Sequence, residues 1–197
     1  MSSDEEGIKV ILLGESFVGK TSLIKVSIGE KFSSIEATTI SSNFSVKTFD
    51  YKGKKYNFNL WDTIGEEKYR SLTKIFFTDA KIVILVYDIT DKKSFGQLGY
   101  WYEQVTDSLN DQDFILAIVG NKKDLCGREQ ITQDQGKTFA EEKKAKFKLT
   151  SAKDDPMSFI TLLEELFKEY IDNFGGKKKR KNSKLKGKKD KKSGGCC

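Results

Sequence analysis

The chain has 197 residues, a formal net charge of +6, no His and only three Cys, which suits one domain with a tail and argues against a His/Cys metal site or a His-based catalytic pair. From residue 175 onward, eleven Lys and Arg stand against one Asp, so residues 1–174 carry 24 basic and 28 acidic groups. Because the expected folded part is weakly acidic, a nucleic-acid-binding domain is disfavoured.

The chain starts with residues 1–7, which are polar and acidic, unlike a secretory or mitochondrial leader, and Ser2 stands where N-myristoylation needs Gly. No run of about 18 apolar residues follows, so we expect no membrane-spanning helix. Cys126 is the only Cys before the last two positions. It has no partner for a disulfide within the domain, which indicates a cytosolic protein.

Apolar runs then alternate with segments of helical periodicity. Strands are expected over 8–13, 43–50, 55–61, 81–88, 114–119 and 146–149, with a hairpin turn at 52–54. Helices are expected over 20–28, 94–109, 132–143 and 156–173, the last starting at Pro156. The pattern predicts an α/β fold with a doubly wound, mostly parallel six-stranded sheet and one antiparallel strand. We expect a disordered N-terminus (1–7), one nucleotide-binding domain (8–174) and a disordered basic tail (175–197).

A phosphate-binding loop follows the first expected strand. Residues 14–21 read G-E-S-F-V-G-K-T and match the pattern G-x-x-x-x-G-K-[ST] between a strand and a helix. The backbone N–H groups of such a loop surround phosphates together with the helix N-terminus. We expect Lys20 to neutralise the β- and γ-phosphates and the Thr21 hydroxyl to bind Mg²⁺. The loop residues expected to contact the nucleotide are Ser16, Phe17, Val18, Gly19, Lys20, Thr21 and Ser22.

Two later motifs indicate that the base is guanine. Residues 121–124 read N-K-K-D and follow a buried strand, at the sheet edge where ligands bind in such folds. The Asp124 carboxylate can accept from the N1–H and the 2-amino group of guanine, whereas adenine offers neither donor. A site that leaves such buried groups unpaired when the wrong base binds can favour guanine over adenine by ~10⁴-fold or more in affinity. Residues 151–153 (S-A-K) follow the last strand, where the Ala152 N–H can reach guanine O6.

These motifs resemble, in order and spacing, the five guanine-binding boxes of the Ras-superfamily GTPases. The boxes are residues 14–21, Thr39, 62–65, 121–124 and 151–153, and the resemblance covers about residues 8–174. It implies GTP and GDP as the bound nucleotides and Mg²⁺ as cofactor. The implied magnesium ligands are Thr21, Thr39 and Asp62. The implied base and γ-phosphate contacts are Phe32 and Lys122 on the two guanine faces, Asn121, Asp124, Ser151, Ala152 and Lys153 around the base, and Thr39 and Gly65 beside the γ-phosphate.

The resemblance also implies a switch, because Thr39 and Gly65 are held only while a γ-phosphate is present. The implied catalytic residues are Lys20, Thr39, Gly65 and Glu66. Glu66 stands where the family has Gln, whose amide both donates and accepts hydrogen bonds, whereas a carboxylate only accepts and adds negative charge. We therefore expect slow intrinsic hydrolysis. A second departure, Ser41 in place of the family's Gly, bears on effector identity.

Several stretches resemble the Rab branch of the superfamily. Residues 85–90 (L-V-Y-D-I-T) match a Rab signature, and residues 61–63 and 68–72 resemble others. The aromatic triad that Rab effectors contact corresponds to Phe44, Trp61 and Phe76. Packing in the core is the alternative explanation for these three side chains.

The C-terminus ends in Gly-Gly-Cys-Cys. A C-a-a-X box would need Cys fourth from the end. The ending instead resembles that of Rab proteins geranylgeranylated on both cysteines, here Cys196 and Cys197, and two lipid chains anchor stably. Two unmodified thiols are the alternative. The basic run 177–181 is interpreted as a membrane-facing arm rather than a nuclear-localisation or nucleic-acid patch.

The leading hypothesis is a monomeric Rab-like GTPase that regulates vesicular trafficking on the cytoplasmic face of intracellular membranes and cycles through the cytosol. Its implied partners are an exchange factor, an activating protein, a GDP-dissociation inhibitor, a Rab escort protein and effectors, with no nucleic acid. One alternative is a nearly non-hydrolysing GTP-binding scaffold kept loaded by Glu66. The other is a Ras- or Rho-like signalling GTPase, which the C-terminus and the lack of a Rho-type insert before Thr150 disfavour.

Overall fold

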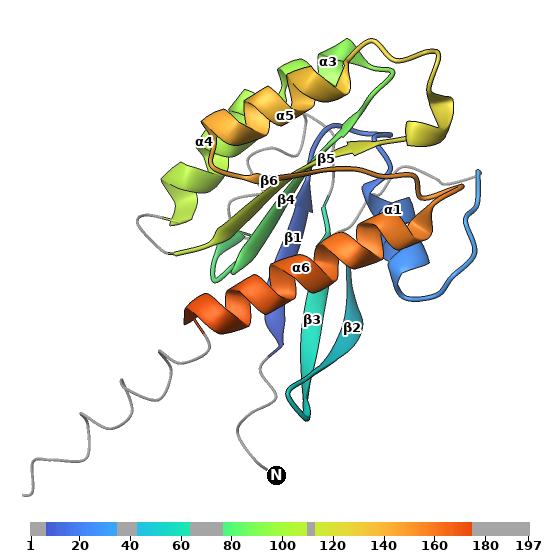
Figure 1. The fold of residues 1–197 in the computed structure, drawn as a ribbon. Coiled ribbons are helices and arrows are strands. Elements are labelled where there is room, and N and C mark those ends of the chain that lie inside the picture. The colour runs from blue at the N-terminus through green and yellow to red at the C-terminus, as the bar shows by residue number, and fades with distance from the viewer. Residues whose placement is uncertain (1–6, 35–42, 64–76, 110–112, 175–197) are drawn as a thin grey trace, which may run out of the picture.

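The computed structural model describes residues 7–34, 43–63, 77–109 and 113–174. Six strands in these ranges form one sheet in the order β2-β3-β1-β4-β5-β6 (Figure 1). The pair β2–β3 is antiparallel, and every other neighbouring pair is parallel. This confirms the predicted sheet with one antiparallel strand. The strands are β1 (Ile8–Leu13), β2 (Asn43–Tyr51), β3 (Lys54–Asp62), β4 (Ile82–Asp88), β5 (Ile115–Asn121) and β6 (Lys146–Leu149).

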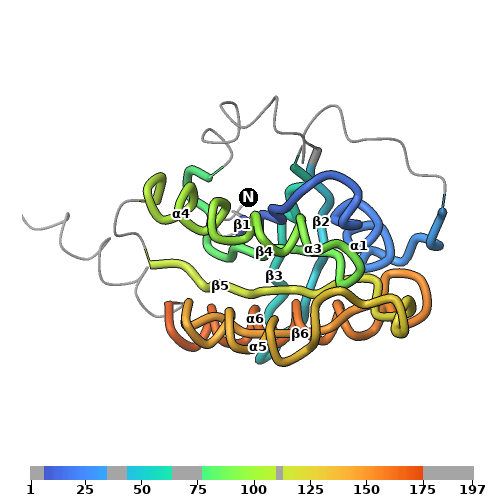
Figure 2. Tube along the Cα trace, turned by 90° about the horizontal axis from the view of Figure 1, so that it is seen from above, coloured from blue at the N-terminus to red at the C-terminus, as the bar shows by residue number. Residues whose placement is uncertain are grey.

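Helices cover both faces of the sheet, since two separate apolar clusters flank it. On one face, α1 (Lys20–Ser27) and α6 (Pro156–Phe174) pack against the strands. On the other, α3 (Lys92–Gly96), α4 (Leu98–Leu109) and α5 (Gln133–Glu142) do so. The view from above in Figure 2 separates α4 from α6 across the sheet. In the described residues, no helix is both long and apolar enough to cross a bilayer.

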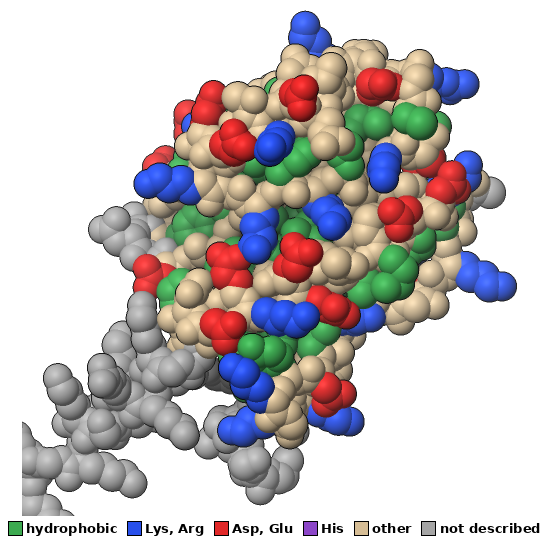
Figure 3. All heavy atoms as spheres, in the orientation of Figure 1, with side chains coloured by type: hydrophobic (Ala, Val, Ile, Leu, Met, Phe, Trp, Pro, Cys, Tyr) green, Lys and Arg blue, Asp and Glu red, His purple; other side chains and the backbone are tan. Residues whose placement is uncertain are grey.

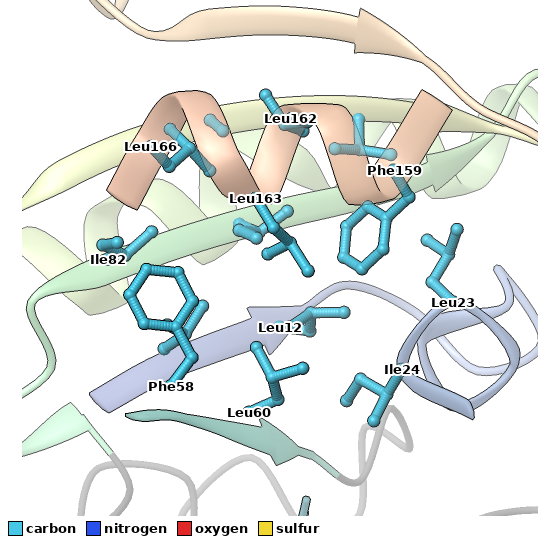
Figure 4. Close-up of a cluster of buried hydrophobic side chains, with 14 of the residues drawn as sticks. Leu12, Leu23, Ile24, Phe58, Leu60, Ile82, Phe159, Leu162, Leu163 and Leu166 are labelled. Atoms are coloured by element: carbon cyan, nitrogen blue, oxygen red, sulfur yellow. The ribbon is translucent and has the colours of Figure 1, made fainter. Parts of the chain in front are cut away.

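The first cluster lies between α6 and the sheet. Phe159 and Leu163 of α6 point toward Leu12 of β1 and Leu60 of β3 (Figure 4), and all four side chains are buried. Fully burying one such side chain contributes about 1.5–3 kcal/mol. The helix expected over 156–173 is present as α6 and begins at Pro156, as expected. The cluster fixes α6 against the sheet, and the loops at the carboxyl edge therefore start from rigid strands.

Two predicted boundaries were wrong. The helix predicted over 94–109 is two helices. The first, α3, begins earlier because the Asp91 carboxylate accepts a hydrogen bond from the Lys93 N–H; it ends at Gly96, and α4 begins at Leu98. Strand β5 continues through Asn121 instead of ending at 119, since Gly120 and Asn121 pair with Tyr87 and Asp88 of β4. The first residue of the N-K-K-D motif therefore belongs to the sheet itself.

Charge is mixed on the surface that faces the viewer in Figure 3, where basic and acidic side chains are interspersed. The basic excess of the whole chain comes from residues 175–197. These residues lie outside the described part of the chain.

Candidate nucleotide-binding site

A pocket of about 410 Å³ lies at the carboxyl edge of the parallel strands, where β1, β5 and β6 end. Twelve of the predicted nucleotide-site residues line it, and they come from the three motif segments and, in addition, from Phe32: Ser16, Phe17, Gly19, Lys20, Thr21, Ser22, Phe32, Asn121, Lys122, Asp124, Ala152 and Lys153. Val18 and Ser151 sit beside the pocket instead, each buried. Thr39, Gly65 and Glu66 lie outside the described residues.

Sequence reasoning missed some of the lining. Ser33, Ser34, Thr63 and Leu125 also face the pocket. Thr63 lies inside the 62–65 box, whereas no motif singles out the other three, which only adjacency to Phe32 or Asp124 could have found. The lining of the pocket therefore includes residues outside the sequence motifs.

The phosphate loop needs glycine at two positions. Gly14 has φ +143° and Gly19 has φ +96°, both unfavourable for other residues. A Cβ on Gly14 would lie 2.1 Å from the Val86 carbonyl oxygen, and one on Gly19 would lie 2.4 Å from Asn121 Nδ2. Phe17 also has a positive φ, 64°, although it is not glycine, and its side chain is 72% exposed. Such a conformation costs roughly 1–3 kcal/mol and is typical of binding loops.

Lys20 is buried inside the loop that carries it. Its ammonium donates hydrogen bonds of 2.9 Å to the carbonyl oxygens of Gly14 and Glu15. Burial lowers the pKa of Lys20 to about 8, against the opposing attraction of Asp62 and Glu15. The cation is thus fixed at the pocket wall with little water around it, where it can interact strongly with phosphate oxygens.

Thr21 lines the pocket, and its hydroxyl contacts Asp62, which lies behind it and is not itself part of the lining. The Thr21 hydroxyl donates a 2.7 Å hydrogen bond to Asp62 Oδ2, and the Asp62 residue is 8% exposed. Hydroxyl and carboxylate oxygens are ligands that Mg²⁺ prefers, usually alongside water and substrate phosphates. The pair therefore fits the implied magnesium site. Among the described residues there is no cluster of three or more His, Cys, Asp or Glu that could hold a metal by itself.

Asn121 ties three segments of the site together. Its Nδ2 donates a 2.8 Å hydrogen bond to the Val18 carbonyl in the phosphate loop, and its Oδ1 accepts one of 3.2 Å from the Thr150 hydroxyl. The contact with Val18 connects residues 103 positions apart in the chain. Asn121 thus supports the loop of residues 14–21 in addition to lining the pocket.

The base end contains Asp124 in a fixed orientation. Ser151 Oγ donates a 2.6 Å hydrogen bond to Asp124 Oδ1, and Ser151 Oγ in turn accepts from the Asp154 N–H at 2.9 Å. The carboxylate lines the pocket next to Ala152. A carboxylate acceptor that lines the pocket together with Ala152 is compatible with the N1–H and 2-amino donors of guanine.

Two of the three predicted effector-contact residues are described. Phe44 of β2 and Trp61 of β3 are directly paired across the strands and stack with ring centroids 5.2 Å apart. Lys9 lies over the Trp61 ring at 4.8 Å. Phe44 is 49% exposed, so burial in the core does not account for it. Phe76 lies outside the described residues.

Together, a phosphate loop after β1, an N-K-K-D segment at the end of β5 and an S-A-K segment after β6 define a P-loop protein with a guanine-type nucleotide pocket.

The Ras family model matches residues 9–173. The chain is 38% identical to the Ras-related protein SEC4 of Saccharomyces cerevisiae over 168 residues, 84% of this chain and 77% of that protein. It is 31% identical to the Ras-related protein Rab-10 of Caenorhabditis elegans over 192 residues, 96% and 95% of the two chains. It is 40% identical to the Ras-related protein RabC of Dictyostelium discoideum over 149 residues, 75% and 76% of the two chains. The chain belongs to the Ras family, as a Rab-like small GTPase of vesicle trafficking that hydrolyses GTP.

Proposed function

We propose that this Rab-like GTPase binds its nucleotide in the 410 Å³ pocket, with the phosphates against Lys20 and the guanine against Asp124. The observation that carries the proposal is the convergence of three distant segments on that one pocket. The loop backbone surrounds the phosphates, and the Lys20 ammonium neutralises them. The Ser16 hydroxyl, which is buried, lines the pocket and has no hydrogen-bond partner in the described part of the chain, is available to the ligand.

The residues at the phosphate end would hold Mg²⁺ through Thr21 and Asp62, with Thr39 as the further ligand that the family resemblance implies. Bound there, the ion supplies charge neutralisation at the β- and γ-phosphate oxygens. The Thr21–Asp62 hydrogen bond holds the Asp62 carboxylate next to Thr21, which lines the pocket. The described residues therefore need little rearrangement to form the site.

At the base end, Phe32 and Lys122 would cover the two faces of guanine, and both line the pocket. Phe32 is 38% exposed, so its ring has free surface for stacking. The Asp124 carboxylate, oriented by Ser151, would accept from the N1–H and the 2-amino group. This arrangement favours guanine over adenine.

The proposal extends to the membrane cycle. Cys196 and Cys197, outside the described residues, would carry geranylgeranyl groups, and the basic tail would contact anionic lipid on the cytoplasmic face of an intracellular membrane. The Phe44–Trp61 stack would be part of the effector surface while GTP is bound. An exchange factor, an activating protein, an escort protein and a GDP-dissociation inhibitor would complete the cycle.

Nucleotide competition tests the site. The unmodified protein should bind GDP at least ~10⁴-fold more tightly than ADP, and Asp124→Asn should shift preference toward xanthosine diphosphate, because its 2-oxo group needs a donor. Asp172→Asn, on α6 far from the pocket lining, is the matched control and should leave both affinities unchanged. Binding of ADP as tight as that of GDP would contradict the assignment of Asp124.

A further inference from the structure

Asp88 lies just behind the base end of the pocket. It is the last residue of β4 and is paired in register with Asn121 of β5. Its side chain does not line the pocket and is only 7% exposed. Asp88 Oδ2 lies 2.7 Å from the ammonium of Lys122, which does line the pocket. Asp88 belongs to the L-V-Y-D-I-T segment (residues 85–90), which has no role in the proposed nucleotide contacts.

Both oxygens of the Asp88 carboxylate are engaged. Oδ1 accepts hydrogen bonds from the Thr90 N–H at 2.8 Å and from the Thr90 hydroxyl at 2.7 Å. The Asp88 N–H donates to Ser94 Oγ at 3.1 Å. A nearly buried carboxylate is costly unless it is paired and hydrogen-bonded. Here the turn formed by residues 88–90 fixes the carboxylate on one side and Lys122 neutralises it on the other.

Lys122 is held in an unusual backbone conformation. Its φ is +66°, in the left-handed region that non-glycine residues rarely occupy. The Lys123 N–H donates to the Thr150 carbonyl at 3.0 Å, and the Leu125 N–H donates to the Lys122 carbonyl at 2.8 Å. Strain of this kind persists only where the surroundings enforce it, and it gathers at binding sites.

The ion pair has a consequence for ligand binding. A Lys side chain loses rotamer entropy when it becomes ordered. If it is already ordered before the ligand binds, this entropy cost no longer opposes binding. With its ammonium held by Asp88, Lys122 presents its apolar methylene stem to the pocket rather than a mobile charge. A flat base can pack on such a stem.

We propose that Asp88, oriented by Thr90, is a positioning residue for the nucleotide: it anchors the Lys122 ammonium so that the Lys122 stem forms a preformed wall for the guanine ring. This inference rests on the proposed function, in which Lys122 covers one face of the base. It assigns the acidic residue of the L-V-Y-D-I-T segment to nucleotide affinity. The residue acts through Lys122 and not by touching the ligand.

The test is a double-mutant cycle on the full chain loaded with fluorescent GDP, read out as the GDP dissociation rate. Asp88→Asn removes the ion pair and should accelerate dissociation by about tenfold. Lys122→Met, which removes the ammonium but keeps an apolar stem of the same length, should accelerate it by a similar factor, because the stem is no longer held by Asp88. In the Lys122→Met background, Asp88→Asn should add less than a twofold change, because its partner is gone. Asp172→Asn breaks an exposed ion pair with Lys52 and should leave the rate unchanged.

Thr90→Val is the second variant, since it loosens the carboxylate without leaving a buried charge unpaired. It should accelerate GDP dissociation about threefold, again only while Lys122 is present. The thermal unfolding midpoint of every variant is measured alongside, so that a general loss of stability is recognised by equal acceleration in both Lys122 backgrounds.

The outcomes separate the two levels of the proposal. If Lys122→Met accelerates dissociation while Asp88→Asn and Thr90→Val do not, the positioning role of Asp88 is wrong and the proposed pocket stands. If the Asp88→Asn effect is the same with and without Lys122, Asp88 acts on the fold and the inference is also wrong. If Lys122→Met itself leaves dissociation unchanged, anchoring of its ammonium does not affect the nucleotide and the inference is wrong, whereas the proposed site is overturned only if ADP binds as tightly as GDP in the competition experiment.

Discussion

The Thr21 hydroxyl at the start of α1 and the Asp62 carboxylate at the end of β3 are joined by a 2.7 Å hydrogen bond, although 41 residues separate them in the chain. Strand β3 lies next to β1, whose end leads into the phosphate loop, so the sheet order brings the two oxygens together. Both are of the type that Mg²⁺ prefers. The pair gives the first prediction.

Thr21→Asn should weaken GTP binding more than GDP binding, by a further factor of about ten, which corresponds to about 1.4 kcal/mol. The reason is that the Thr21 and Asp62 oxygens would hold the cation that neutralises the γ- as well as the β-phosphate. Equilibrium titration with fluorescent GDP and a non-hydrolysable GTP analogue measures the ratio. Thr48→Asn, on the exposed hydrogen bond to Asn57 of the hairpin, serves as control. Equal losses for the two nucleotides would count against Thr21 as a magnesium ligand.

Lys20 leads to a pH prediction for the nucleotide-free protein. Its pKa falls from 10.5 to about 8 on folding, chiefly through burial. Between these values the unfolded chain binds the proton and the folded chain releases it, so the free energy of unfolding rises with pH from about pH 8 to 10.5. Below pH 8 the full desolvation penalty remains.

Urea unfolding from pH 7 to 10 measures how the free energy of unfolding changes with pH. One titrating group contributes at most about 1.4 kcal/mol per pH unit to this slope. Lys20→Met should lose that part of the slope, and Lys52→Met, on the exposed surface, should keep it. GDP loading should also abolish it, because bound phosphate favours the protonated ammonium. A slope that persists unchanged in Lys20→Met would show that Lys20 does not titrate in this range.

Tyr87 gives a stability prediction. Its side chain on β4 is fully buried, burial raises its pKa, and its hydroxyl has no hydrogen-bond partner in the described part of the chain. An unsatisfied buried hydroxyl costs about 1–3 kcal/mol. Tyr87→Phe should therefore raise the free energy of unfolding by about 1 kcal/mol, seen as a thermal midpoint roughly 2–4 °C higher.

The matched control is Tyr51→Phe, since the Tyr51 hydroxyl is exposed and donates to Asp172. That variant should be neutral or slightly destabilising. A drop in the thermal midpoint for Tyr87→Phe would mean that its hydroxyl has a partner, such as water, that stabilises the fold.

Most of the site could be predicted because each of its motifs is continuous in sequence. Lys20 and Asp124 were found from short patterns that demand a certain backbone and chemistry. The contacts between motifs could not be found in that way. The Asn121–Val18 hydrogen bond and the Asp88–Lys122 ion pair depend on strand order and register, which local periodicity does not fix.

The boundary errors have the same origin. Strand β5 reaches Asn121 because β4 offers partners as far as Asp88, a property of the neighbouring strand and not of the segment itself. The earlier start of α3 follows from its capping by Asp91, whereas the apolar spacing of the segment favoured a start at Ser94. Tertiary pairing and capping overrode the local pattern in both places.

Removal of the two C-terminal thiols tests the membrane proposal. The Cys196→Ser, Cys197→Ser double variant should move to the cytosolic fraction, while its GDP affinity stays unchanged because the nucleotide motifs lie within residues 14–153. The control is Cys126→Ser, which removes an exposed thiol of the folded domain; this variant should remain on membranes. Cell fractionation measures the distribution, and a double variant that still sediments with membranes would contradict lipid anchoring at these positions.

The last prediction concerns Glu66, which lies outside the described residues and departs from the family's Gln. Intrinsic GTP hydrolysis should be slow, and Glu66→Gln should accelerate it about tenfold. The amide can donate toward the phosphoryl oxygens as well as accept from the attacking water, and a negative charge beside the reacting phosphate disappears. A tenfold gain requires only about 1.4 kcal/mol of transition-state stabilisation, the size of one hydrogen bond to a charged group.

Single-turnover hydrolysis of preloaded GTP, without an activating protein, measures the effect of Glu66→Gln. Glu67→Gln, the neighbouring position with the same change of charge, is the control and should leave the rate unchanged. If both substitutions accelerate hydrolysis equally, the effect is one of general charge and not of a positioned amide. If Glu66→Gln leaves the rate unchanged or lowers it, the expected role of this position is wrong, while nucleotide binding, which depends on Lys20 and Asp124, is unaffected. A rate near zero for the unmodified protein even with an activating protein would instead favour a GTP-binding scaffold that stays loaded.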